Sequence, residues 1–333
     1  MRYPVTNMVF EGGGVLGIAY LGVLDYLYSQ GVFQNVKRVA GTSAGAITAC
    51  VSSFNLPFNE IKAIADSLDY RKVPQSKAHS DLKHIPAPIK HEIDKLFGDV
   101  NSIYRIVKNY GWYSTDYFYH WLQEQIANQF DSKKKKPPYT FRDFQNTDIH
   151  RSNRTFKDLY IIGTNISYKT SKVFSYETTP DMEVAEAVRI SMSIPLFFEA
   201  VKTTDPAITA ETKVNVFCDG GVMDNYPINT FDYPRFNETK HYGFNVNTLG
   251  ARFKSKVKYS EITNILSYIK NLNLALTQIQ QDIYNHSPYD QARSIVIDTK
   301  DVSSTDFNIS PHDATYNFLY SQGYLAAKGF YRQ

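Results

Sequence analysis

The alternation of hydrophobic and polar positions over the first 50 residues predicts strand, helix, strand and helix in succession. Residues 7–10 form a short apolar run that ends at three glycines. Over residues 15–29 apolar side chains recur every three or four positions, as in an amphipathic helix, and Gly31 ends the pattern. A second apolar run at 36–40 leads into a helix of small residues that begins near Ala46. Strands that alternate with helices predict a parallel β-sheet.

Further apolar runs extend the predicted sheet over the whole chain. The strands expected downstream are residues 159–162, 173–176, 214–218, 242–246 and 294–297. This distribution favours one large α/β domain over residues 1–333. Residues 60–150 interrupt it with a mostly helical or irregular insertion or cap, in which helices are expected at 89–97 and 117–128.

The C-terminal part, residues 259–330, is expected to be helical. Residues 259–283 have the apolar periodicity of a long amphipathic helix, for which packing against the core is a better explanation than insertion into lipid. A last helix is expected to begin with Ser310 as N-cap and Pro311 as its first residue.

Composition and charge narrow the class of protein. The chain has 333 residues, of which 43% are hydrophobic and 21% charged, so it can bury a core and is not intrinsically disordered. A formal charge of +3 gives no reason to expect a nucleic-acid partner. The two cysteines, Cys50 and Cys218, form neither a disulfide framework nor a metal-ligand cluster, so a reducing compartment without structural zinc is the default expectation.

The sequence also limits how the chain could meet a membrane. We recognise no cleavable signal peptide and no apolar stretch of about 20 residues that could span a bilayer, so a cytoplasmic or peripheral membrane location is expected, with leaderless export still open. The one charge run contains lysines at 133–136 and ends in two prolines. A solvated loop explains this run better than contact with a membrane surface.

The first candidate chemistry lies in the glycine run that follows the first strand. Residues 12–17 satisfy the GxGxxG pattern of dinucleotide sites, but such sites need an acidic residue after the second strand, and residues 26–59 contain none. A P-loop is excluded because no Lys-Ser or Lys-Thr pair follows Gly17. What remains is a set of backbone N–H groups at a helix N-terminus, able to hold a phosphate or an oxyanion.

A serine follows the second predicted strand in the pattern of a nucleophile elbow. Gly41-x-Ser43-x-Gly45 stands between a strand and a helix, where the glycines make room for a sharp turn that exposes the serine. If the first two strands are neighbours, the Gly12–Gly14 loop lies beside Ser43. A serine next to backbone N–H donors is the arrangement that acyl transfer requires.

A serine nucleophile needs a base, and Asp219 is the candidate. It ends the predicted strand at 214–218, and two glycines follow it, so its carboxylate is expected at the rim of the sheet. His241 is the best placed histidine, just before an expected strand, which leaves open an α/β-hydrolase triad of Ser43, Asp219 and His241.

These motifs together resemble the patatin-like phospholipase family. The resemblance rests on the segments 11–17, 41–45 and 219–221, in that order, and on the Ser-x-Ser-Ile-Pro run within 187–198. It implies a three-layer α/β/α fold with a mostly parallel central sheet, and hydrolysis of acyl esters of phospholipids or other lipids without cofactor or metal. It further implies Ser43 as nucleophile, Asp219 as base of a Ser-Asp dyad without histidine, and Gly12, Gly13 and Gly14 as the oxyanion hole.

One position departs from the family pattern. Family members commonly have Arg or Lys where this chain has Leu16, so a phosphate contact made there is lost while the backbone donors are kept. A non-catalytic module that binds lipid or phosphate remains the alternative from a different class.

Overall fold

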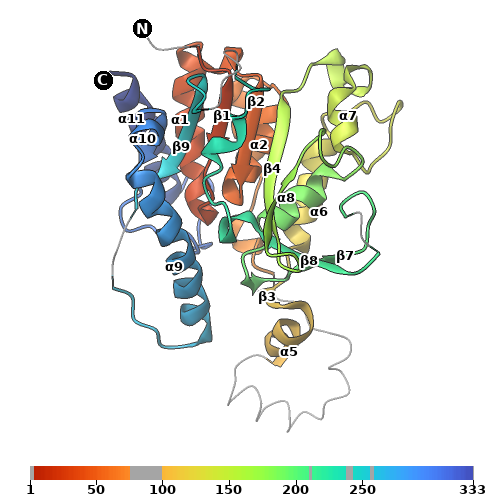
Figure 1. Ribbon diagram of the computed structural model, residues 1–333, viewed down its shortest axis with the longest axis vertical. Coiled ribbons are helices and arrows are strands. Elements are labelled where there is room, and N and C mark those ends of the chain that lie inside the picture. Colours follow the sequence, from red (N-terminus) through yellow and green to blue (C-terminus); the bar gives the residue numbers. More distant parts are fainter. Residues whose placement is uncertain (1–3, 76–99, 210–211, 238–242, 256–258, 333) are drawn as a thin grey trace.

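The computed structural model describes residues 4–75, 100–209, 212–237, 243–255 and 259–332 (Figure 1). Its centre is a sheet in the order β10-β9-β1-β2-β4-β8-β7, with β5 paired to β4. The parallel part consists of β10 (Ser294–Ile297), β9 (Thr248–Phe253), β1 (Asn7–Phe10), β2 (Arg38–Thr42) and β4 (Asp158–Asn165). The sheet is therefore mostly parallel, as predicted.

The other strands of this sheet run antiparallel to their neighbours. They are β5 (Thr170–Phe174), β7 (Val201–Thr203) and β8 (Asn215–Asp219). A separate parallel pair joins β3 (Gly111–Tyr113) to β6 (Leu196–Phe198) and so connects the region of the expected cap to the segment before β7.

Helices flank the sheet (Figure 1). In chain order they are α1 (Ala19–Ser29), α2 (Ala44–Ser53), α3 (Phe58–Asp66), α5 (Val100–Asn109), α6 (Asp116–Ala127), α7 (Phe141–Gln145), α8 (Val184–Ser191), α9 (Ile265–Asn285), α10 (Pro288–Ala292) and α11 (Ala314–Arg332). The predicted helix at 117–128 corresponds to α6. The one predicted at 89–97 lies outside the described residues.

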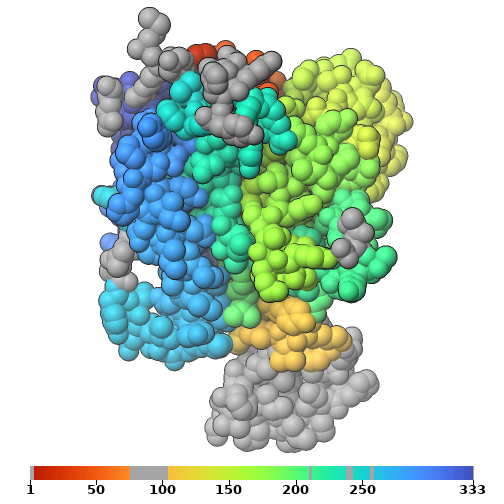
Figure 2. All heavy atoms as spheres, viewed as in Figure 1, coloured from red at the N-terminus to blue at the C-terminus, as the bar shows by residue number. Residues whose placement is uncertain are grey.

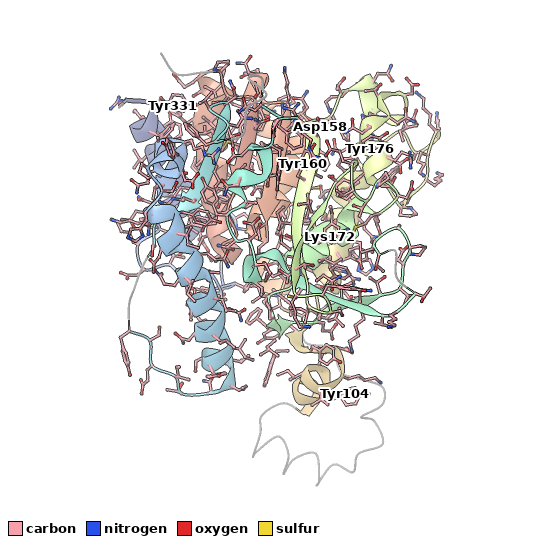
Figure 3. The ribbon with its side chains drawn as sticks, in the orientation of Figure 1. Tyr104, Asp158, Tyr160, Lys172, Tyr176 and Tyr331 are labelled. Carbon is pink, nitrogen blue, oxygen red and sulfur yellow. The ribbon has the colours of Figure 1, made fainter. Side chains whose placement is uncertain are left out.

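Successive side chains along the strands point to opposite faces of the sheet, and each face has its own hydrophobic core. Met8 and Phe10 point into the larger core, which is completed by α1, α2, α8 and α11. Val9 points to the opposite face, into a smaller core covered by residues 226–236 and part of α9. Tyr160, labelled on β4 in Figure 3, packs there with its ring edge-on to Phe231. The sheet is thus the middle of three layers.

One predicted strand is wrong. Tyr242 lies outside the described residues, and residues 243–247 form a turn before β9. Asn245 organises this turn, because its side-chain amide donates to the carbonyl oxygens of Phe231 and Phe236 at 3.0 Å. A side chain used in this way favours a turn over a strand.

Two predictions about the C-terminal helices are also wrong. The last helix begins at Ala314, and Asp313 rather than Ser310 caps it, since the Asp313 carboxylate accepts a hydrogen bond from the Tyr316 N–H at 2.8 Å. The long amphipathic helix begins only at Ile265, and most of its apolar side chains face outward rather than into the core.

The lysine run lies in the turn between α6 and α7, as the loop interpretation expected. Lys134 donates to the Asp148 carbonyl oxygen, and Lys135 forms an ion pair with Asp143 at 3.5 Å. Figure 1 draws this connection toward the end of the molecule that holds the N-terminus, whereas β1 and β2 direct their carboxyl ends away from it.

Candidate active site

Ser43 is the single residue that connects β2 to α2, and its backbone is strained. Its φ of 54° and ψ of −123° lie where a residue with a side chain is rarely found. The flanking glycines permit this turn: a Cβ on Gly41 would lie 2.1 Å from the Gly45 carbonyl oxygen, and one on Gly45 would lie 2.2 Å from that of Phe10. The predicted elbow is therefore a close approach of backbones that excludes any other residue at both positions.

Asp219 reaches Ser43 from an antiparallel strand. Asp219 pairs with Gly163 of β4, one residue beyond Ile162, which pairs with Thr42 of β2. β8 therefore enters from the carboxyl end of the parallel strands and ends beside Ser43. Asp219 lies at the rim of the sheet, as predicted, but its strand runs in the opposite direction to β1 and β2.

The carboxylate of Asp219 is buried and hydrogen-bonded. It interacts with the Ser43 side chain and accepts the Gly221 N–H at 2.7 Å. Burial raises its pKa from 3.8 to about 7, against these two hydrogen bonds, which stabilise the anion. A carboxyl group with a pKa near neutrality is suited to accept and return a proton.

The glycine loop lies on the other side of Ser43. The Gly12 N–H donates to the Asn225 carbonyl oxygen at 2.9 Å, so in this structure it holds the loop in place. Gly14 has a φ of +55°, and a Cβ on it would lie 2.0 Å from the Ser304 carbonyl oxygen. A Cβ on Gly13 would lie 2.2 Å from the Phe253 ring. Gly13 and Gly14 are thus the candidates for donors to an oxyanion.

These groups share one cavity of about 610 Å³, a size typical of small-molecule sites. Its walls are the glycine loop, Ser43, Asp219, residues 299–305 and one side of α9. A second, mostly apolar pocket of about 40 Å³ adjoins Ser43 and Gly14 on the side of the larger core.

Comparison with known proteins is consistent with this geometry. Residues 8–232 match the patatin-like phospholipases. The chain belongs to this family. It is 29% identical over 305 residues to the uncharacterised protein YqhO of Bacillus subtilis, covering 91% of this chain and 90% of that protein. It is 24% identical over 268 residues to the probable lipid hydrolase 463L of Invertebrate iridescent virus 6, covering 78% and 77%.

A solved structure shows the same fold. VipD from Legionella pneumophila matches with a TM-score of 0.58 at 18% identity, over 98% of this chain and 67% of that one. The three-layer α/β/α architecture predicted from the sequence is thus that of the patatin-like proteins.

Ser191 and Ser193 support the backbone at Ser43 and Asp219 in this patatin-like protein. The Ser191 hydroxyl accepts the Ser43 N–H at 2.9 Å and donates to the Ile162 carbonyl oxygen. The Ser193 carbonyl oxygen accepts the Asp219 N–H at 2.8 Å. The Ser-x-Ser-Ile-Pro run was visible in the sequence, but its hydrogen bonds to the backbone of Ser43 and Asp219 were not.

Glu11 joins the glycine loop to the C-terminal part of the chain. Its buried carboxyl accepts hydrogen bonds from the Phe253 N–H at 2.7 Å, from the Asn225 amide at 3.2 Å and from the Gln281 amide. Burial raises its pKa to about 8, opposed by the Phe253 N–H, by the charge of Arg252 and by the Asn225 amide. Its contacts indicate a structural role, since it binds three other segments of the chain.

α9 fixes the loop that follows Asp219. The Gln280 side chain accepts the Asn225 N–H at 2.7 Å and donates to the Gly221 carbonyl oxygen at 2.8 Å. The sequence carried no signal for this contact, because a glutamine on the polar side of an amphipathic helix is ordinarily taken as solvated.

The structure does not place every candidate from the sequence. His241 lies outside the described residues. Among the residues that the structure describes, no group of three or more His, Cys, Asp or Glu side chains could hold a metal ion. Within the same residues, every helix is too short or too polar to cross a bilayer.

Proposed function

We propose that the chain is a lipid acyl hydrolase that cleaves fatty-acyl esters with Ser43 as nucleophile and Asp219 as general base. The observation that carries the proposal is the contact between the Ser43 side chain and the buried Asp219 carboxylate, at the wall of a cavity large enough for a lipid ester. Membership in the patatin-like phospholipases supports it, as does similarity to a protein named a probable lipid hydrolase.

The first half of the reaction forms an acyl-enzyme. The Ser43 oxygen attacks the ester carbonyl carbon while its proton passes to Asp219. The tetrahedral intermediate carries its negative charge on the former carbonyl oxygen, toward which the Gly13 and Gly14 N–H groups would donate. The intermediate collapses, the bond to the alcohol oxygen breaks, and that oxygen takes the proton back from Asp219.

The second half releases the acid. Water attacks the acyl carbon of Ser43 and gives a proton to Asp219, and the second tetrahedral intermediate expels the serine oxygen, which regains that proton. The products are a fatty acid and the free enzyme, and one carboxylate serves as base in both halves.

The surroundings of Ser43 suit an acyl chain. The 40 Å³ pocket beside it is lined largely by apolar side chains, among them Ile47, Leu68, Phe118, Met192 and Phe307. Leu16 adds an apolar side chain to the wall of the larger cavity, where a basic residue is common in the family. Contact of the first methylene groups of an acyl chain with these side chains would favour lipid esters over polar ones.

A fluorophosphonate probe and a panel of lipid esters test the proposal. We expect the probe to label wild type on the peptide that contains Ser43, and to leave Ser43→Ala unlabelled. Fatty acid should be released from at least one phospholipid or neutral acyl lipid. Failure of labelling together with absence of hydrolysis would instead indicate a module that binds lipid or phosphate without cleaving it.

The pH dependence of the reaction should report Asp219. Because burial raises the pKa of this carboxyl to about 7, and only its anion accepts a proton, log kcat/KM should rise with unit slope below about pH 7 and level off above it. The pH midpoint of this rise should shift little with temperature, because the ionisation of a carboxyl group absorbs little heat. The ionisation of an imidazolium group absorbs much more heat, so its midpoint would shift. A strongly temperature-dependent midpoint would point to a histidine base.

Alanine at Gly13 should lower turnover on the order of 10²-fold, the loss expected for a damaged oxyanion hole. The added methyl group would lie 2.2 Å from the Phe253 ring, so the loop must shift. Its N–H groups would then no longer point toward the oxyanion. Gly329→Ala is the matched control, because a Cβ there meets nothing within 4 Å. Steady-state kinetics on a soluble ester would measure both. Equal rates for both variants would remove Gly13 from the proposed oxyanion hole.

A further inference from the structure

The outward side of α9 carries a continuous apolar stripe. Its members are Ile265, Tyr268, Leu272, Leu276, Ile279 and Ile283, with side-chain exposures between 36% and 66%. Figure 2 shows this helix, in blue, on the surface of the face in view. An exposed apolar patch of this length marks a contact with something other than water.

The polarity of α9 is partly the reverse of that of an ordinary surface helix, because amides as well as Ile269 and Tyr284 face the protein. The side facing the protein carries amides: Asn273 donates to the Pro195 carbonyl oxygen at 3.2 Å, and Gln280 and Gln281 bind the catalytic loops. Lys270 and Asp282 are the charged residues of this 21-residue helix. A helix selected to face water would place charges, not isoleucines, on its outer side.

The spacing of the stripe places its members on one side of the helix. From Ile265 to Ile283 the stripe advances 18 residues in five steps, a mean of 3.6 residues per step. This equals one turn of a straight helix, so the side chains form a line parallel to its axis.

The stripe is continuous with the mouth of the catalytic cavity. Leu276 belongs to the stripe and also lines the cavity. Leu274 and Tyr259, which are not part of the stripe, line the cavity too. Tyr259 is 88% exposed, and Tyr is well suited to the boundary between apolar and polar layers. A layer of lipid against α9 would therefore lie directly at the entrance to Ser43.

We propose that the outward face of α9 is the docking surface of this protein and inserts into the surface of a lipid layer, so that the cavity opens onto its substrate. The inference rests on the proposed function for the identity of the substrate, and it deepens that function by placing the membrane on a named face. The lysine run between α6 and α7 is drawn toward the other end of the molecule, so it would not share this contact (Figure 1).

Binding to vesicles of pure phosphatidylcholine tests the docking surface in a Ser43→Ala background, in which lipid is not consumed. The test variant replaces Ile265, Ile279 and Ile283 with glutamine, which keeps a helix-forming residue at exposed positions outside the cavity wall. The matched control replaces Val214, Tyr233 and Leu325, which are 57–58% exposed, with glutamine. Circular dichroism and thermal unfolding establish that both variants fold.

We expect the control to sediment with vesicles like its parent, and the α9 variant to bind at least about tenfold more weakly, because its side chains no longer leave water for the acyl layer. Binding should change little at 0.5 M salt, since apolar contacts are not screened. Equal binding of the two variants, or no binding by the parent, would overturn the proposal. A dimer seen by light scattering and lost in the α9 variant, with unchanged vesicle binding, would assign the stripe to a second copy of the chain.

Activity separates this inference from the proposed function. With Ser43 intact, the α9 variant should hydrolyse a short soluble ester at the wild-type rate. It should hydrolyse vesicle lipid at least about tenfold more slowly than wild type. If wild type hydrolyses neither substrate while the α9 variant still loses vesicle binding, the docking surface stands and the proposed hydrolase does not. If the α9 variant hydrolyses vesicle lipid at the wild-type rate, the docking surface is refuted and the hydrolase is retained.

Discussion

Replacement of Ser43 by alanine should lower ester hydrolysis by on the order of 10⁴-fold or more, because no other group can form the acyl-enzyme. The fold should survive. Alanine keeps the Cβ, so the strain at φ 54° is unchanged, and the hydrogen bond from the Ser43 N–H to Ser191 does not involve the side chain that is lost. Release of fatty acid from a soluble ester would measure the loss.

Ser52→Ala is the matched control for this experiment. Ser52 is a buried serine on α2, the helix that begins just after Ser43, and its hydroxyl has no hydrogen-bond partner among the described residues. We expect its activity to stay near that of wild type. A Ser43→Ala enzyme within about tenfold of wild type would mean that catalysis does not depend on this serine.

Asparagine at Asp219 should be nearly as damaging, with a loss on the order of 10³-fold or more in kcat, because a neutral amide cannot take the serine proton. The hydrogen bond from the Gly221 N–H can be kept by the amide oxygen, so the loop should hold its place. The same ester assay measures the effect. Asp224→Asn serves as control, since Asp224 is another carboxyl in this loop whose pKa burial raises, to about 6, and it lies outside the cavity wall.

The Asp219 variant should also be more stable than wild type at alkaline pH. The pKa of Asp219 is raised on folding, so its ionisation disfavours the folded state increasingly from about pH 4 and fully above about pH 7. The gap between 3.8 and about 7 corresponds to on the order of 4 kcal/mol, an upper limit to what asparagine recovers. Thermal unfolding should show a higher midpoint for the variant at pH 8 and little difference at pH 4. Lower stability at pH 8 would show that the amide disturbs the loop.

The parts of the site that were predictable are those encoded in short, contiguous segments. A strand followed at once by glycines, or by Gly-x-Ser-x-Gly, marks both the element and the position of its chemistry. The position of Ser43 in a turn between a strand and a helix therefore followed from the sequence, and the adjacency of β1 and β2 placed the glycine loop beside it. Asp219 followed from its two glycines, although its strand runs antiparallel, because a strand that enters from the carboxyl rim can end beside the same edge.

The remaining parts depend on contacts between segments far apart in the chain. The bond between Ser191 and Ser43 joins positions 148 apart, and that between Gln281 and Glu11 joins positions 270 apart, so neither leaves a local pattern. For α9, periodicity grouped the outward-facing Ile265, Leu272, Leu276, Ile279 and Ile283 correctly, but it placed Ile269, which is buried, in the same set. It could not show which side the protein covers, since that depends on the amides that bind the catalytic loops.

The position of β9 shows that the segment matching the family is shorter than the segment needed to complete the sheet. The match ends at residue 232, yet β9 comes from residues 248–253 and lies between β10 and β1 inside the sheet. A fragment cut at residue 232 would leave β1 as an open edge, prone to pair with other chains, and would take from Glu11 its partners Phe253 and Gln281. The last hundred residues carry no recognisable motif, yet truncation there should yield aggregates rather than a smaller enzyme.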